Sequence, residues 1–123
     1  MQSETTTIAA IATAPGTGAI AVVRLSGTKA IPIADRVFLS VHDKILSKQK
    51  SHTIHLGHIV QGNQTLDEVL VSLFKGPNSY TGEDVVEFSC HGSTYIQQQI
   101  IQLLVDQGAQ LAEPGEFTLR AFI

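Results

Sequence analysis

The sequence predicts an α/β fold (α+β-like) in which helices pack on a mixed β-sheet. The composition is that of a globular protein, with 43% hydrophobic and 15% charged residues among 123. Short apolar runs bounded by turn residues alternate with segments whose apolar residues recur at helical spacing. Read in order, these segments give β-β-α-β-β-β-α-β-α. This order favours a single domain over residues 1–123 with helices packed on one sheet.

Strands are predicted where runs rich in Ile, Val, Ala or Thr lie between turn residues. These runs are Thr5 to Ala14, Ala19 to Leu25, Thr53 to Val60, Leu66 to Phe74, Asp84 to Cys90 and the short Ala109 to Ala112. Gln61-Gly62-Asn63-Gln64-Thr65 is predicted to join two of them as a hairpin. Val41 to Ser51 is expected to be a polar connector, and Gly76 to Gly82 a loop dense in turn-forming residues.

Three helices are predicted. The first starts after Ser26-Gly27-Thr28, and its apolar residues at helical spacing are Ala30, Ile31, Ala34, Val37 and Phe38. Ser93 caps the second and Gly108 ends it. The third opens at Pro114-Gly115-Glu116. This helix runs into the apolar residues Ala121-Phe122-Ile123, which would lack a partner surface in this chain alone. The chain is therefore expected to be the N-terminal domain of a longer protein.

Charge and cysteine content limit the possible functions. The net charge is -3, and the only basic cluster is Lys44, Lys48 and Lys50, in the expected connector. A domain that binds nucleic acid alone usually has a basic face, so only weak, salt-dependent RNA binding is expected. The single Cys90 cannot form an internal disulfide, and no apolar run is long enough to span a membrane. A cytoplasmic protein is therefore expected.

Two nucleotide-binding motifs are excluded. Gly16-Thr17-Gly18-Ala19-Ile20-Ala21 matches G-x-G-x-x-A, but that motif requires a helix next, and Ile20 to Val23 is predicted as strand. A tight turn is the better interpretation. The phosphate loop of NTPases, G-x-x-x-x-G-K-[ST], does not occur in the 123 residues. This chain alone is therefore not expected to be catalytic.

Two other patterns have a chemical and a structural interpretation. His52, His55 and His58 could suggest a metal site, but on a strand His55 faces away from the other two, so surface histidines are the preferred interpretation. Cys90-His91 could suggest a thiol nucleophile with its base. Neighbouring strand residues point to opposite faces, and Cys90 shares its face with Val86 and Phe88, which favours a core thiol.

Arg24 and Glu87 are the candidate binding residues. Each lies in the middle of an otherwise apolar strand, and a buried guanidinium or carboxylate needs a partner. They could pair with one another as a structural ion pair. Alternatively, they could face a cavity and bind a polar planar ligand, because a carboxylate accepts parallel N–H bonds and an arginine can hold a carboxylate in a fork. The residues alone leave both alternatives open.

Three segments resemble the signatures of the MnmE (TrmE) family of tRNA-modification GTPases. They are Ile8 to Gly27, Phe74 to Gly92 and Glu113 to Phe122, in the order and at the spacing of the family. The second commonly ends in His-Gly-Gly, whereas this chain has His91-Gly92-Ser93. The resemblance covers essentially the family's whole N-terminal domain.

The resemblance implies a fold similar to the tetrahydrofolate-binding domain of aminomethyltransferases. It implies binding of a one-carbon tetrahydrofolate, in the 5-formyl or 5,10-methylene form, and a homodimer with the folate near its interface. The family's folate-contacting arginine and glutamate align with Arg24 and Glu87, and Asn78 and His91 are further candidates. A lysine that also contacts folate in the family would lie beyond Ile123.

For the full-length protein the resemblance implies GTP hydrolysis, with magnesium and potassium, in a GTPase domain inserted in a helical domain. With the FAD-containing partner MnmG, such an enzyme modifies carbon 5 of the wobble uridine in tRNA. Two alternatives remain for this chain. One is a pure dimerisation scaffold in which Arg24 and Glu87 form a structural ion pair, and the other is a thiol hydrolase using Cys90.

Overall fold

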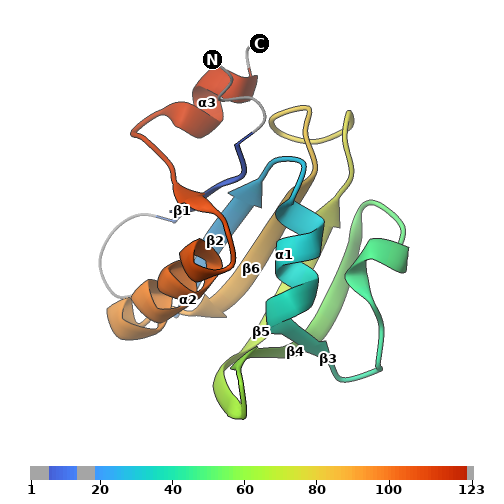
Figure 1. The fold of residues 1–123 in the computed structure, drawn as a ribbon, viewed down its shortest axis with the longest axis vertical. Coiled ribbons are helices and arrows are strands. Elements are labelled where there is room, and N and C mark those ends of the chain that lie inside the picture. The colour runs from blue at the N-terminus through green and yellow to red at the C-terminus, as the bar shows by residue number, and fades with distance from the viewer. Residues whose placement is uncertain (1–5, 14–18, 122–123) are drawn as a thin grey trace.

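The computed structural model describes residues 6–13 and 19–121, which form a mixed β-sheet covered by helices on one face (Figure 1). The strands are β1 (Ile8–Ile11), β2 (Ile20–Ser26), β3 (Phe38–Ser40), β4 (Thr53–Gln61), β5 (Gln64–Phe74), β6 (Val85–His91) and β7 (Gln110–Leu111). The helices are α1 (Ala30–Val37), α2 (Thr94–Asp106) and α3 (Glu116–Ala121), with a short 3₁₀ helix at Leu46–Lys48. The predicted α/β class is confirmed.

The sheet contains seven strands within the described residues, in the order β3-β4-β5-β6-β2-β1-β7. Every pairing is antiparallel except that of β1 with β7, which is parallel. The predicted hairpin is confirmed, since β4 and β5 pair through Gln61 and Gln64 across a turn at Gly62, whose φ is +60°. The predicted interior position of the Arg24 strand is also confirmed, because β2 lies between β1 and β6.

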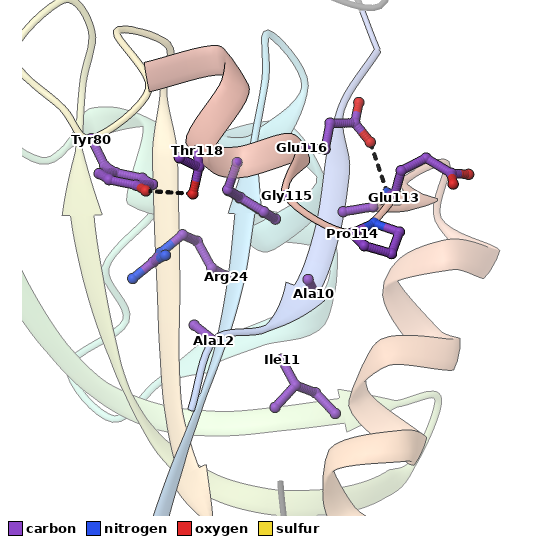
Figure 2. Close-up of a pocket in the computed structure, with 12 residues that line it drawn as sticks. Ala10, Ile11, Ala12, Arg24, Tyr80, Glu113, Pro114, Gly115, Glu116 and Thr118 are labelled. Atoms are coloured by element: carbon purple, nitrogen blue, oxygen red, sulfur yellow. Dashed lines mark hydrogen bonds between the residues drawn. The ribbon is translucent and has the colours of Figure 1, made fainter. Parts of the chain in front are cut away.

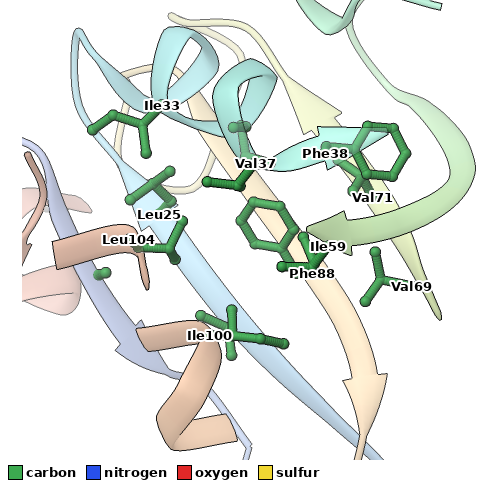
Figure 3. Packing of buried hydrophobic residues seen from close by; sticks show 14 of the residues in the cluster. Leu25, Ile33, Val37, Phe38, Ile59, Val69, Val71, Phe88, Ile100 and Leu104 are labelled. Atoms are coloured by element: carbon green, nitrogen blue, oxygen red, sulfur yellow. The ribbon is translucent and has the colours of Figure 1, made fainter. Parts of the chain in front are cut away.

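The hydrophobic core lies between the sheet and the helices α1 and α2 (Figure 3). Phe88 of β6 is fully buried and packs among residues of both helices, such as Val37 and Leu104. Ser93 caps α2 by accepting a hydrogen bond from Ile96 N at 3.4 Å, and Gly108 follows its end with φ +116°. Both helix ends agree with the prediction. None of the described helices is long and apolar enough to cross a lipid bilayer.

Helix α1 begins at Ala30, after Ser26-Gly27-Thr28 as predicted, but the prediction was wrong at its C-terminal end. Ser26 is buried in β2 and does not cap the helix, whose first residues are instead held by Thr7 Oγ1, the acceptor of Lys29 N at 3.0 Å. Phe38 is not the last helical residue but the first of β3, where it is paired with Ile59 of β4. Phe38 fits both helical spacing and a strand, so pairing with a distant strand decides its state.

The register divides the strand residues between two faces. Antiparallel partners lie side by side on the same face of a sheet. On the face opposite α1 and α2, one row of cross-strand partners runs from β1 through β2, β6 and β5 to β4. That row is Ala10, Arg24, Glu87, Ser72 and Ile54. We call this side of the sheet the open face.

Candidate functional site

Arg24 and Glu87 are direct cross-strand partners on β2 and β6. Arg24 Nε donates to Glu87 Oε2 at 2.8 Å, so the two predicted residues do come together. The two side chains are only partly buried, at 26% and 24% exposed, and not buried as expected. The open face is the reason, since α1 and α2 cover only the opposite side of the sheet.

A cavity of about 340 Å³ lies beside Arg24, between β1, β2 and the start of α3 (Figure 2). Its floor is formed by Ala10 and Ala12, and its wall by the segment from Ala112 to Thr118. Tyr80 closes a further side. A cavity of this size lies within the usual range for small-molecule sites.

Two aromatic rings flank the Arg24 guanidinium. Its central carbon lies 5.1 Å from the centroid of the Tyr80 ring and 5.8 Å from that of Phe117, distances at which a cation is attracted to a ring. Tyr80 and α3 are also joined directly, because the Tyr80 hydroxyl lies 3.2 Å from Thr118 Oγ1. The two rings therefore hold the guanidinium at the mouth of the cavity.

The ion pair leaves hydrogen-bonding capacity unused. Arg24 donates to Glu87 through Nε, and within the described residues Nη1, Nη2 and Glu87 Oε1 have no hydrogen-bond partner. Arginine has five N–H donors in a fixed planar geometry, and a carboxylate accepts through both oxygens. The pair can therefore persist while both residues bind a ligand. The ion pair and the ligand site do not exclude one another.

The other candidate residues lie away from the cavity. Asn78 is exposed in the loop between β5 and β6 and does not line the cavity. His91 is on the open face four residues beyond Glu87, with its side chain 70% exposed. Its backbone N–H and its Nδ1 both bond the Asp67 carboxylate, at 2.8 and 2.6 Å. His91 lines a smaller cavity of about 230 Å³ with Ile20 and Leu70.

The structure does not bring His52, His55 and His58 together as a metal site. His52 precedes β4 and its ring meets Phe74 edge-on at 5.2 Å between centroids. His55 is buried on the covered face, where its Nε2 lies 2.8 Å from Thr53 Oγ1. Within residues 6–13 and 19–121, no group of three metal-binding side chains is found. Burial, and then the charge of Lys44, lower the pKa of His55.

Cys90 is a core thiol, as its strand position predicts. Its side chain is buried on the covered face, 3% exposed, beside Phe88 in the core cluster. Burial, and then the charge of Asp67, raise the pKa of the Cys90 thiol to about 11. Because the thiolate is the nucleophile, a thiol with this pKa is poorly suited to catalysis.

Sequence reasoning identified Arg24 and Glu87 but missed the walls of the cavity. Tyr80, Phe117 and Thr118 come from two segments nearly forty residues apart, which only the tertiary fold brings together. The available signal was aromatic residues in segments rich in Gly and Pro. Such loops often hold binding residues, but the signal does not identify a partner.

A family model and the sequences of known proteins point to the same family. The family described as GTP-binding protein TrmE N-terminus matches residues 7–123. A protein of Flavobacterium johnsoniae named tRNA modification GTPase MnmE is 66% identical over 116 residues, covering 94% of this chain and 25% of that protein. Proteins of the same name from Flavobacterium psychrophilum and Enterococcus faecalis are 64% and 53% identical. The chain spans about a quarter of the length of these relatives.

Proposed function

The chain belongs to the family of TrmE N-terminal domains, and from this premise we propose that it is the folate-binding, dimerising part of a tRNA-modifying GTPase. The observation on which the ligand site depends is that Arg24, which is paired with Glu87, lines a cavity with aromatic sides. The proposed ligand is a one-carbon tetrahydrofolate, in the 5-formyl or 5,10-methylene form.

The chemistry of the site supports this ligand. The amino-pyrimidine edge of a reduced pterin presents N–H donors in a row. Glu87 Oε1 can accept hydrogen bonds from these donors, because Arg24 bonds only Oε2. The same ring system has a carbonyl oxygen, and the ligand's tail has carboxylates, either of which Arg24 can bind through Nη1 or Nη2. The rings of Tyr80 and Phe117 offer flat apolar surface beside these groups.

A titration with 5-formyltetrahydrofolate tests the proposal. We expect saturable binding to the chain, measured by calorimetry, and loss of most of the affinity in Glu87→Gln. Arg36→Met is the matched control, because Arg36 bonds Gln107 on the helical side of the sheet, away from the cavity. Absence of binding to the unmodified chain would contradict the folate assignment.

We also propose that the open face forms the interface of a homodimer. Five large apolar side chains from β2 to β5 are 41–66% exposed there: Ile20, Leu39, Ile54, Leu56 and Leu70. Contiguous exposed apolar surface of this kind is typical of a protein–protein interface. The ligand site lies on the same face, so a second copy on this face would lie close to the bound folate.

Light scattering tests the dimer. We expect twice the mass of one chain at tens of micromolar, and a monomer for the double variant Ile54→Asp, Leu70→Asp. Tyr95→Asp is the control, because Tyr95 is 69% exposed on α2, on the other side of the sheet. A monomeric mass for the unmodified chain, or a dimer that persists in the double variant, would contradict this interface.

The remaining functions are proposed for the full-length protein. GTP binding and hydrolysis, with magnesium and potassium, would lie outside these 123 residues, which contain no phosphate loop. The partnership with MnmG, the modification of tRNA and a cytoplasmic location are proposed on the family relationship. We therefore expect no GTP turnover by this chain, which a phosphate-release assay would measure.

The second candidate function is a pure dimerisation scaffold. The 2.8 Å contact between Arg24 and Glu87 favours it, because it satisfies part of each charge within the protein. In this alternative the pair stabilises the sheet and the cavity has no ligand. The folate titration separates the two functions.

A further inference from the structure

Helix α3 lies beside the sheet and places none of its described side chains in the hydrophobic core cluster. It has six residues, too few for a helix to be stable alone in water. Its one buried side chain is Arg120, whereas Leu119 is 62% exposed. Among the described residues, no member of the hydrophobic core cluster belongs to α3. The position of α3 therefore depends on polar contacts.

Arg120 makes those contacts with two other parts of the chain. Its Nη1 donates to Glu83 Oε1 and Oε2 at 2.9 and 3.2 Å, and to the carbonyl oxygen of Thr6 at 2.7 Å. Its Nη2 donates to Glu116 Oε2, one turn earlier in α3, at 3.2 Å. The side chains of Arg120 and Glu83 are only 6% and 18% exposed. An ion pair this well shielded is weakened little by salt.

Glu83 is fixed in turn by the sheet. Ser26 at the end of β2 donates to Glu83 Oε1 at 2.9 Å, and the Ser26 hydroxyl lies 2.6 Å from that of Thr81. The chain neighbours of this network are the aromatic sides of the cavity, because Tyr80 precedes Thr81 and Phe117 follows Glu116. The network thus joins the two segments that carry the rings beside Arg24.

We propose that the Arg120–Glu83 ion pair is a latch that docks α3 and so positions Phe117 and Thr118 at the Arg24 cavity. A ligand that touches this wall binds better when α3 is docked. By linkage, the bound ligand stabilises the docked helix by the same factor. Only the identity of the ligand depends on the function proposed above.

The latch can open without unfolding the domain. If α3 leaves, Arg120 and Glu83 both become solvated, so neither charge remains buried without a partner. The core between the sheet, α1 and α2 is unaffected, since α3 adds no residue to it. Arg120 and Glu83 are therefore positioning residues, and their loss should alter the cavity more than the stability of the fold.

A fluorescence experiment tests the docking without any ligand. The chain contains no tryptophan, so Phe117→Trp introduces a single reporter in the wall of the cavity. In this background we expect Arg120→Met to raise acrylamide quenching of the indole toward that of the unfolded chain. Arg36→Met, which removes a surface arginine bonded to Gln107, should leave quenching unchanged. The melting temperature should change little in both.

Folate affinity tests the consequence, in chains that keep Phe117. We expect Arg120→Met to bind 5-formyltetrahydrofolate at least about tenfold more weakly, and Arg120→Lys to recover part of the affinity because it keeps the charge. Unchanged quenching in Arg120→Met, a large fall in its melting temperature, or full affinity with an exposed indole would each overturn the latch. If the unmodified chain binds no folate, the proposed ligand is wrong, and the quenching result still decides the latch.

Discussion

The two faces of the sheet are built from alternate residues of the same strands, yet they differ in almost every property. On the face covered by α1 and α2, Val23, Phe88 and Val71 form a row of fully buried apolar side chains. The adjacent residues of the same strands, Arg24, Glu87 and Ser72, form the neighbouring row on the open face. A shift of one residue thus separates the core from the candidate site.

This difference assigns the stability of the fold to the covered face and the proposed ligand binding to the open face. The covered face excludes water and gains the free energy of apolar burial. The open face needs only to keep its charged groups paired and accessible, and the 26% and 24% exposure of Arg24 and Glu87 meets that requirement. Substitutions on the two faces should therefore alter different measured quantities.

The largest expected effect is on the covered face. Phe88→Ala removes a fully buried ring and should lower the free energy of unfolding by about 3–5 kcal/mol. Leu70→Ala on the open face is the matched control; because Leu70 is 46% exposed, we expect a loss below about 1 kcal/mol in the isolated chain. Urea titrations of both measure the contrast, and similar losses would contradict the division between faces.

Cys90 tests how well the covered face excludes reagents. Its pKa is raised from 9.0 to about 11, so the thiolate fraction at neutral pH should be about a hundredfold below that of an ordinary cysteine. We expect labelling of the folded chain by a maleimide to be slower than labelling in urea by at least this factor. Rapid labelling in the folded state would revive the thiol hydrolase alternative.

On the open face, Glu87→Gln should weaken folate binding by roughly 2–3 kcal/mol, because a donor replaces an acceptor oxygen opposite the ligand's donors. Stability should change by less than about 1 kcal/mol, since the pair is partly exposed to solvent. Calorimetric titration and thermal melts on the same protein measure both quantities.

Arg24→Met and the double variant complete this test. In the scaffold alternative, each single variant lowers the melting temperature, and the double variant recovers part of the loss. Normal folate affinity in Glu87→Gln together with a large loss of stability would exclude Glu87 from the ligand site.

The smallest expected effect comes from His55, a titratable group on the covered face. Its pKa is lowered below 6.5 by burial and by Lys44, so the unfolded chain binds the proton more readily than the folded one. The stability due to the neutral ring is fully present above pH 6.5 and declines as the pH falls toward the folded-state pKa. His55→Gln should remove this decline, measured as the difference in unfolding free energy between pH 7.5 and 5.5.

Local patterns predicted most of the fold because each face has its own periodicity. The alternation Val85, Glu87, Ser89, His91 identifies a strand and assigns Glu87 to the face opposite Phe88. Strand β3 was missed because Phe38 also fits the helical spacing of α1, and only its pairing with Ile59 distinguishes the two states.

The candidate site was predictable in part. The presence of a charge within an apolar strand singled out Arg24 and Glu87. Their cross-strand pairing depends on the register of β2 with β6, and the cavity walls depend on how α3 packs near Tyr80. Arg120 gave no signal at all, because a lone arginine near the end of a short helix normally lies in solvent.

The hydrogen bond that ties α3 to Thr6 has a consequence for the newly made chain. A ribosome synthesises β4, β5 and β6 as neighbours, so these strands can pair while the rest is still being made. By contrast, the hydrogen bond from Arg120 to the carbonyl of Thr6 joins residues 114 positions apart. The cavity wall is therefore the last part of the domain to be synthesised, and a nascent chain that has not reached Arg120 cannot complete the proposed ligand site.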